Sequence, residues 1–335
     1  MEVFHNKKIS NTTYPSYWII EGHTYIDCEF KDVVFSSTAK LKDCTFVNCS
    51  FKNCGFNRNF ESCVFTNSTI KGSSFFGGKK KLMHIFKNCH LDLDFVNCNL
   101  FKVKIAEDNN VKKINFKDSE IDFCFFTNNG AFTLDNSLSL NSHYDFSNVK
   151  ILNESDIKNN SFYKATIGEM NKTNIDLSSF NYCNFFVEDF SSNQIWTNQF
   201  NNCNFHKGVF YENTLIDNKF KQCNITKMNY CNSYLFKNKF SECAFTNNQH
   251  SHMDFTENKY DNCILNNNEY YHSEYNEEKY LNCTFGENTM QNIKFDKCEI
   301  ESDLSLVKFI DCKLPKTLIP KSSKPEDTVN SEMSL

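Results

Sequence analysis

Proline is nearly absent from most of this chain. Among its 335 residues the four prolines are Pro15, Pro315, Pro320 and Pro325, so none occurs between residues 16 and 314. Proline cannot donate a hydrogen bond to a strand ladder, and its absence therefore favours one long paired region. Three prolines then arrive together with Ser, Lys and Glu after Leu314. We expect residues 315–335 to form a disordered tail.

Arginine is scarcer still, because Arg58 is the only one and the other basic residues are lysines. Such a chain lacks the bidentate guanidinium groups that read phosphates and guanine. Residues 1–120 carry a net charge of +4, and residues 121–335 carry −9. These charges argue against specific nucleic-acid binding.

Long apolar runs are also missing. No stretch of eighteen apolar residues occurs, and the N-terminus has no charged start followed by an apolar segment. We therefore expect neither a membrane span nor a Sec-type signal peptide.

Cysteine and phenylalanine, by contrast, are abundant and recur together in a regular five-residue pattern, which we call the beat. The chain has 17 cysteines and 35 phenylalanines, and sixteen of the cysteines stand two residues before a large apolar residue. Only Cys231 falls outside this pattern. A large residue, here named a centre, recurs every five residues without a slip from Phe180 to Ile300. A centre and the residue two before it share one face of an extended segment, so both are predicted to point inward.

A second period of twenty residues relates the cysteines from Cys183 to Cys283. Four five-residue sides therefore make one coil, and self-similarity at a fixed period indicates a solenoid. We predict a solenoid over residues 26–314, with residues 1–25 as an N-terminal segment or cap. The beat is interrupted near 76–85, 106–115 and 127–179, where we expect irregular loops. Loops of this kind often carry binding function.

The five-residue beat resembles that of pentapeptide-repeat proteins. This chain has Cys and Phe where the family prefers Ala and Leu, which keeps a small residue before a large one. The resemblance implies an all-β, right-handed quadrilateral β-helix with four five-residue sides per coil. The family shares no single activity, so the fold alone gives no function.

The regular cysteines are predicted to be free, buried packing residues. A spacing of twenty is not that of a zinc site, and stacked cysteines point in parallel instead of toward one another. We expect no metal and no cofactor, and seventeen free thiols favour a reducing cytoplasm, here a bacterial one. The predicted core ladder consists of Cys183, Cys203, Cys223, Cys243, Cys263, Cys283, Phe185, Phe205, Phe245 and Phe285.

Two groups of polar residues are candidates for interaction. Lys79, Lys80 and Lys81 follow two glycines in an expected loop, where they could touch an acidic surface or simply be solvated. His252 and His272 differ by twenty residues and should stack on one outer face, either as a proton-sensitive or metal site or as a plain duplicated surface ladder.

The sequence favours a non-enzymatic protein-interaction scaffold, because long flat faces suit protein contact. The resemblance to pentapeptide-repeat proteins of enteric bacteria, among them type III effector-like members, implies a bacterial origin. Its partner is not identified, and a homodimer through the C-terminal coil is expected. The arginine-poor composition is compatible with an effector-like protein that is delivered into a host cytosol. Two alternatives stay open: a DNA mimic that interacts with gyrase or another topoisomerase, and an uncharacterised enzyme. DNA mimicry is disfavoured by the magnitude of the charge. A rod of about 65 Å of duplex DNA would carry about 40 negative charges, whereas residues 121–335 carry a net charge of only −9.

Overall fold

The computed structural model describes most of residues 2–314. The exceptions are residues 12, 15–18, 36–39, 57–59, 62, 77–80, 83–84, 88, 97–98, 102, 106–109, 118, 123, 128–130, 136, 146–147 and 187–188. The tail expected at 315–335 lies outside the described residues, as do Lys79 and Lys80. The chain divides into two compact units, unit 1 from Met1 to Thr166 and unit 2 from Ile167 to Leu335.

Unit 1 consists of short parallel strands, and no helix occurs among its described residues. The coils contribute strands to the same set of columns, and neighbouring coils pair strand to strand except at one break in the fourth column, after its first three strands. The first column contains β1 (Val3–His5), β5 (Thr24–Ile26), β9 (Thr45–Val47), β13 (Val64–Thr66), β16 (Ile85–Lys87), β19 (Lys104–Ile105), β22 (Phe125–Thr127), β25 (His143–Asp145) and β28 (Ser161–Tyr163).

The second and third columns of unit 1 merge into one sheet, because several strands run through both. These strands are β2 (Lys8–Ser10), β3 (Thr13–Tyr14), β6 (Glu29–Lys31), β7 (Val34–Phe35), β10 (Ser50–Lys52), β11 (Gly55–Phe56), β14 (Thr69–Phe76), β17 (His90–Val96), β20 (Asn110–Lys117), β23 (Ala131–Asp135) and β26 (Asn148–Asn153). The fourth column contains β4 (Ile19–Glu21), β8 (Lys40–Lys42), β12 (Phe60–Glu61), β15 (Lys81–Leu82), β18 (Asn99–Phe101), β21 (Glu120–Asp122), β24 (Leu138–Leu140) and β27 (Asp156–Lys158).

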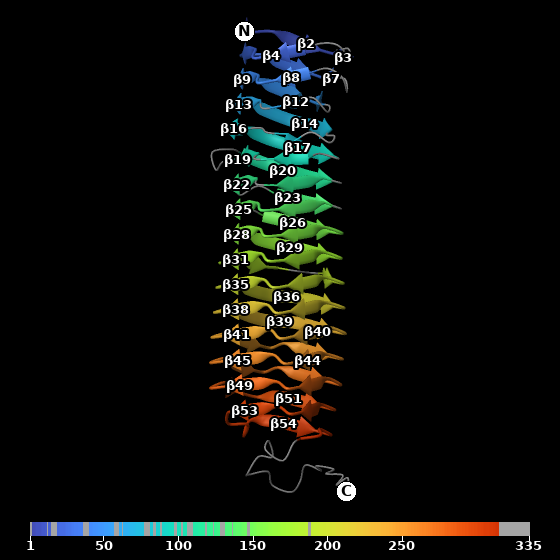
Figure 1. Ribbon diagram of the computed structural model, residues 1–335, viewed down its shortest axis with the longest axis vertical. Coiled ribbons are helices and arrows are strands. Elements are labelled where there is room, and N and C mark those ends of the chain that lie inside the picture. Colours follow the sequence, from blue (N-terminus) through green and yellow to red (C-terminus); the bar gives the residue numbers. More distant parts are fainter. Residues whose placement is uncertain are drawn as a thin grey trace. The chain divides into compact units, whose positions relative to one another are not determined.

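Unit 2 repeats the arrangement with greater regularity. Its first face contains β31 (Ser179–Asn181), β35 (Gln199–Asn201), β38 (Lys219–Lys221), β41 (Lys239–Ser241), β45 (Lys259–Asp261), β49 (Lys279–Leu281) and β53 (Glu299–Glu301), which lie one beside the next in Figure 1. Its fourth face contains β30 (Asn174–Asp176), β34 (Gln194–Trp196), β37 (Thr214–Ile216), β40 (Tyr234–Phe236), β44 (Asp254–Thr256), β48 (Glu274–Asn276) and β52 (Lys294–Asp296).

The second and third faces of unit 2 again form one sheet, because β36 and β39 extend through the corner between them. Their strands are β29 (Thr166–Asn171), β32 (Asn184–Phe185), β33 (Asp189–Ser191), β36 (Asn204–Tyr211), β39 (Asn224–Cys231), β42 (Ala244–Thr246), β43 (Gln249–Ser251), β46 (Ile264–Asn266), β47 (Glu269–Tyr271), β50 (Thr284–Phe285), β51 (Asn288–Gln291) and β54 (Val307–Ile310). The protein is therefore an all-β, parallel-strand solenoid, as the sequence predicts.

The strand register gives the length of each coil. In unit 2 paired residues are twenty apart, as in Phe180 with Phe200 and Ile195 with Leu215. In unit 1 the separation varies: it is 21 for Val3 with Thr24, 19 for Thr45 with Val64 and 18 for Glu120 with Leu138. The twenty-residue period of the sequence thus describes unit 2, whereas unit 1 uses longer and shorter coils.

Corners are made by residues in the left-handed backbone region, two positions after each centre. Asn202 has φ 53° and Asn262 has φ 52°, and 37 non-glycine residues with positive φ occur in the described chain. About half of them are Asn or Asp, the residue types that best tolerate this region. The corner amide also continues the ladder, because Asn202 N donates to Lys221 O at 2.9 Å. Most corners of the described chain are therefore built without glycine, and Gly22, with φ 67°, is an exception.

The interruptions in the beat contain strands wherever the structure describes them. Lys81–Leu82 forms β15, residues from Asn110 onward form β20, and the segment 127–179 contains β23 to β30. Irregular loops were expected there, but the uneven beat of 127–179 reflects coils of 18 residues, as in Leu138 paired with Asp156. The expected N-terminal cap likewise contributes ladder strands, because β1 pairs with β5.

Candidate functional site

The regular cysteines of unit 2 form a buried ladder. Cys183, Cys203 and Cys223 are fully buried, and Cys243, Cys263 and Cys283 are at most 7% exposed. The Cys203 thiol lies 3.3 Å from Phe180 O and 3.4 Å from Asn201 O, to which it can donate, and Cys223 repeats both contacts one coil further on. None of the sixteen described cysteines forms a disulfide. Their position gives them a packing role, since burial disfavours the reactive thiolate and raises the pKa of Cys298 to about 11.

The predicted phenylalanines of the core differ in their burial. Phe185, Phe245 and Phe285 are buried. Phe205 is only half-buried, which corrects the expectation of a fully packed interior there. Its ring stacks on that of Phe185 at a centroid distance of 4.4 Å. The inward position of the following side is Gly208, which has no side chain to fill the corner beside Phe205.

Buried asparagines form further ladders that the sequence reasoning missed. Asn218 is fully buried and donates from Nδ2 to Ile195 O at 2.7 Å and to Asn238 Oδ1 at 3.0 Å. Asn238 Oδ1 also accepts a hydrogen bond from the Asn218 amide. The signal was available, because each of these asparagines stands two residues before a centre. The members of this ladder are Asn198, Asn218, Asn238 and Asn258.

Glu278 takes the next place in this asparagine ladder. Its Oε1 accepts from the Asn258 amide at 2.7 Å and from Asn258 Nδ2 at 2.9 Å. Its Oε2 has no partner within the described chain, and the side chain is fully buried. Burial raises the pKa of Glu278 to about 8, so this carboxyl is protonated at neutral pH.

The structure brings His252 and His272 together, one coil apart on an outer corner. Their rings stack with a centroid distance of 5.3 Å. They line an open groove of about 630 Å³ together with Glu212, Tyr234, Asp254 and Glu274. No group of three metal-binding side chains occurs in the described residues. The pair therefore has the geometry of a surface ladder beside acidic groups.

The lysine candidates are elsewhere. Lys79 and Lys80 lie outside the described residues, and Lys81 begins β15 in unit 1. The histidine pair belongs to unit 2, and the two candidates are therefore not parts of one described site. Within the described residues no helix is long and apolar enough to cross a membrane.

Large apolar side chains project outward on the fourth face of unit 2, in what we call the apolar column. Trp196 pairs in register with Ile216, and Ile216 with Phe236. Trp196 is 42% exposed, and Ile216 and Phe236 are half-buried. Tyr234 widens the column, because its ring lies 5.8 Å from that of Phe236. Three apolar side chains in adjacent coils thus form a continuous outer stripe.

Acidic residues surround the apolar column. Asp176 lies in register with Trp196, and Asp254 lies in register with Tyr234. Asp217 occupies the exposed corner directly after Ile216. The cation of the column, Lys237, lies over the Phe236 ring at 4.5 Å and 3.7 Å from Glu257, so its charge is balanced. The surroundings of the column are therefore negatively charged.

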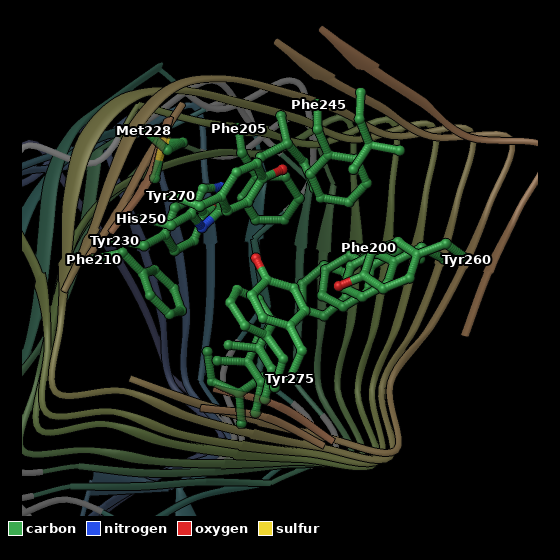
Figure 2. A pocket seen from close by; sticks show the side chains of 18 of the residues that line it. Phe200, Phe205, Phe210, Met228, Tyr230, Phe245, His250, Tyr260, Tyr270 and Tyr275 are labelled. Carbon is green, nitrogen blue, oxygen red and sulfur yellow. The ribbon is translucent and has the colours of Figure 1, made fainter. Parts of the chain in front are cut away.

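The interior of unit 2 contains a cavity of about 50 Å³ among stacked aromatic rings (Figure 2). Phenylalanine and leucine line one part of it, whereas His250, Tyr230, Tyr270 and Tyr275 line another. His250 is a centre, and burial lowers its pKa to about 3, so its ring is neutral. A polar patch therefore lies inside an otherwise apolar solenoid.

Comparison with known proteins finds likeness in fold only. No family model matches the chain, and no curated protein matches it. Among solved structures, HetL, a pentapeptide-repeat protein involved in heterocyst differentiation in the cyanobacterium Nostoc, is 8% identical over 58% of this chain and 89% of its own, with a TM-score of 0.21. QnrB1, a plasmid-mediated fluoroquinolone resistance protein, is 11% identical over 94% of this chain and 92% of its own, with a TM-score of 0.17.

Enzymes with related folds also occur among the similar structures. The catalytic unit of an alpha-1,3-glucanase from Streptomyces thermodiastaticus is 8% identical over 81% of this chain and 60% of its own, with a TM-score of 0.37. Scores this low carry no argument about activity, so identification depends on the chain's own five-residue register, its inward cysteines and centres, and its parallel ladders. Together these features make the protein a β-solenoid that is consistent with the pentapeptide-repeat proteins.

Proposed function

We propose that this chain is a non-enzymatic interaction scaffold that binds another protein through the apolar column of unit 2. The observation that carries the proposal is the outward stripe of Trp196, Ile216 and Phe236. The stripe is informative because its apolar side chains lie in register on adjacent coils, and tryptophan is enriched among residues that dominate binding energy. The ladder holds the stripe rigid, which lowers the entropy cost of binding.

Charge indicates the chemistry of the partner. Asp176, Asp217 and Asp254 lie around the column, and residues 121–335 carry a net charge of −9. A partner segment with apolar side chains between basic residues complements this surface, because opposite charges steer association and fix register. We therefore propose a basic, apolar segment of another protein as the ligand.

The experiment compares substitutions on two faces of unit 2. Trp196→Ser removes the most exposed member of the column, whereas Ile264→Ser removes an apolar side chain that is 51% exposed on the second face. Proteins bound to each immobilised variant are identified by mass spectrometry after crosslinking from a lysate of the source cell. We expect Trp196→Ser to lose a basic partner that wild type and Ile264→Ser retain. Direct titration with the recovered partner should give an affinity that falls about tenfold or more with Trp196→Ser.

The proposal is wrong if both variants retain the same partners with unchanged affinity. It is also wrong if the crosslinks of the recovered partner lie on the second face. A circular dichroism spectrum and a thermal unfolding curve for each variant establish that any loss is not one of folding. The expected homodimer through the C-terminal coil stays a separate prediction, which light scattering of the intact chain tests.

A further inference from the structure

His250 is an unusual centre because both of its ring nitrogens lack a hydrogen-bond partner in the described chain. It lies at the middle of β43 and is 5% exposed. Its ring is sandwiched between those of Tyr230 and Tyr270, at centroid distances of 4.6 and 4.5 Å. A neutral imidazole has one donor and one acceptor, and here neither is used. Buried polar groups are nearly always paired, so these atoms point to a partner that is not protein.

A second unpartnered group lines the same cavity. The Tyr275 hydroxyl is buried without a partner in the described chain, and the side chain is 2% exposed. Its ring lies 6.2 Å from that of Tyr270, which stacks directly on His250. Figure 2 shows the rings of His250, Tyr270 and Tyr275 around one central space. Two independent side chains therefore bring unused polar atoms to one interior site.

The volume of the cavity decides what can bind there. The cavity measures about 50 Å³. An engineered cavity that holds benzene measures about 150 Å³, so an aromatic ligand is about threefold too large. One water needs roughly 10–15 Å³, so about three to five waters would fill the whole cavity and fewer would fill its histidine end. Ions are disfavoured because the surrounding rings and the neutral imidazole offer no balancing charge.

We propose that the interior of unit 2 is a hydrated site, in which a small cluster of ordered water molecules binds to His250 and Tyr275. One water accepts from the protonated ring nitrogen, a second donates to the other nitrogen, and a water of the same cluster bonds the Tyr275 hydroxyl. The part of the cavity lined by Phe210, Leu215 and Leu235 offers no polar atom and stays dry. The hydration is thus confined to the histidine end of the cavity.

The test is a high-resolution crystal structure of the full chain, with and without pressurised xenon. We expect density for at least two waters within about 2.6–3.2 Å of the His250 nitrogens and the Tyr275 oxygen. Xenon prefers dry apolar space, so it should bind only near Leu215 and Leu235 in wild type. Xenon beside His250 in wild type, or no water beside either group, overturns the proposal.

Substitutions sharpen the test. His250→Phe combined with Tyr275→Phe keeps the stacked rings and removes the polar atoms, so the waters should leave and xenon should extend to position 250. Tyr144→Phe is the matched control, because Tyr144 Oη already bonds Ser139 Oγ at 2.8 Å in unit 1, and it should leave the waters in place. If the double variant does not fold, nuclear Overhauser contacts between water and the His250 ring protons in wild type decide the question. Their absence contradicts the proposal.

Discussion

The two units share one architecture of parallel strands but differ in coil length and in the packing of several centres. In unit 1 the rings of Phe86, Phe95 and Phe116 are fully buried. In unit 2 the corresponding centres retain some exposure, such as 6% for Leu215 and 9% for Tyr230, and they line the interior cavity. These centres of unit 2 are therefore less tightly packed than the three phenylalanines of unit 1.

Coil length gives a physical reason for the difference. Unit 2 repeats twenty residues with a large centre on each side, so similar rings stack directly and leave space along the axis. Unit 1 varies between coils of 18 and 21 residues and has a small centre at Ser139, which is fully buried. Mixed side-chain sizes fill an interior more completely than uniform ones. Coils of equal length thus favour regular stacking of like side chains, whereas coils of unequal length favour a mixture of side-chain sizes in the interior.

Buried tyrosine hydroxyls, one in each unit, show the same contrast. The buried Tyr144 hydroxyl in unit 1 is paired with Ser139 at 2.8 Å. In unit 2, the Tyr275 hydroxyl and both His250 nitrogens have no partner among the described residues. A tight core must satisfy its polar groups directly, whereas a cavity leaves room for another partner.

The largest expected change in unfolding free energy comes from truncating a fully buried phenylalanine, and truncating a half-buried one should cost less. Phe65 is fully buried in unit 1, and Phe65→Ala should lower the free energy of unfolding by about 3–5 kcal/mol. Phe205→Ala should cost less, about 1–2 kcal/mol, because the Phe205 ring is already half-buried. Denaturant unfolding of both variants measures the difference. Equal losses would contradict the proposed contrast between the units.

The next effect concerns Glu278 and pH. Its pKa in the folded chain is about 8, above the ordinary value, so the folded state holds a proton that the unfolded state releases. The free energy of unfolding therefore falls as the pH rises from the ordinary value toward 8, by a few kcal/mol. Glu278→Gln should remove this contribution and leave the variant more stable than wild type at pH 8. Identical pH profiles of unfolding would contradict the assignment.

A smaller effect distinguishes the two buried tyrosines. Tyr144→Phe breaks the bond to Ser139 and leaves that hydroxyl without this partner, which should cost about 1–2 kcal/mol. Tyr275→Phe removes a hydroxyl that no described group bonds, so its effect should stay under about 0.5 kcal/mol. Thermal unfolding of the two variants, in the same buffer, provides the comparison. A larger loss for Tyr275→Phe would reverse the expected order.

Much of the fold was predictable because one local rule repeats. The five-residue beat gives the inward positions, and the twenty-residue period gives four strands per coil in unit 2, as the pairing of Phe180 with Phe200 shows. The coils of 18 residues were not predictable in the same way, because a shortened side resembles a loop in sequence. Only the strand pairing between coils distinguishes a short coil from a loop, as the pairing of Glu120 with Leu138 shows.

The candidate sites were less predictable than the fold. The stacking of His252 on His272 follows from their spacing of twenty. The half-burial of Phe205 does not, because Phe205 occupies the same place in the five-residue pattern as the buried Phe185 and Phe245. The apolar column was missed because Trp196, Ile216 and Phe236 stand one residue after a centre and are apart in sequence. Only the register places them on one surface.

The central claim is that the twenty-residue coils of unit 2 leave an unfilled cavity in its interior, whereas described centres of unit 1 such as Leu100 are tightly packed. One paired substitution tests it most directly, since Leu100 in β18 is fully buried and Leu235 in β40 lines the cavity. Leu100→Phe should lower the free energy of unfolding by about 1–3 kcal/mol through overpacking, whereas Leu235→Phe should maintain or raise it. Equal destabilisation by the two substitutions in denaturant unfolding would contradict the account.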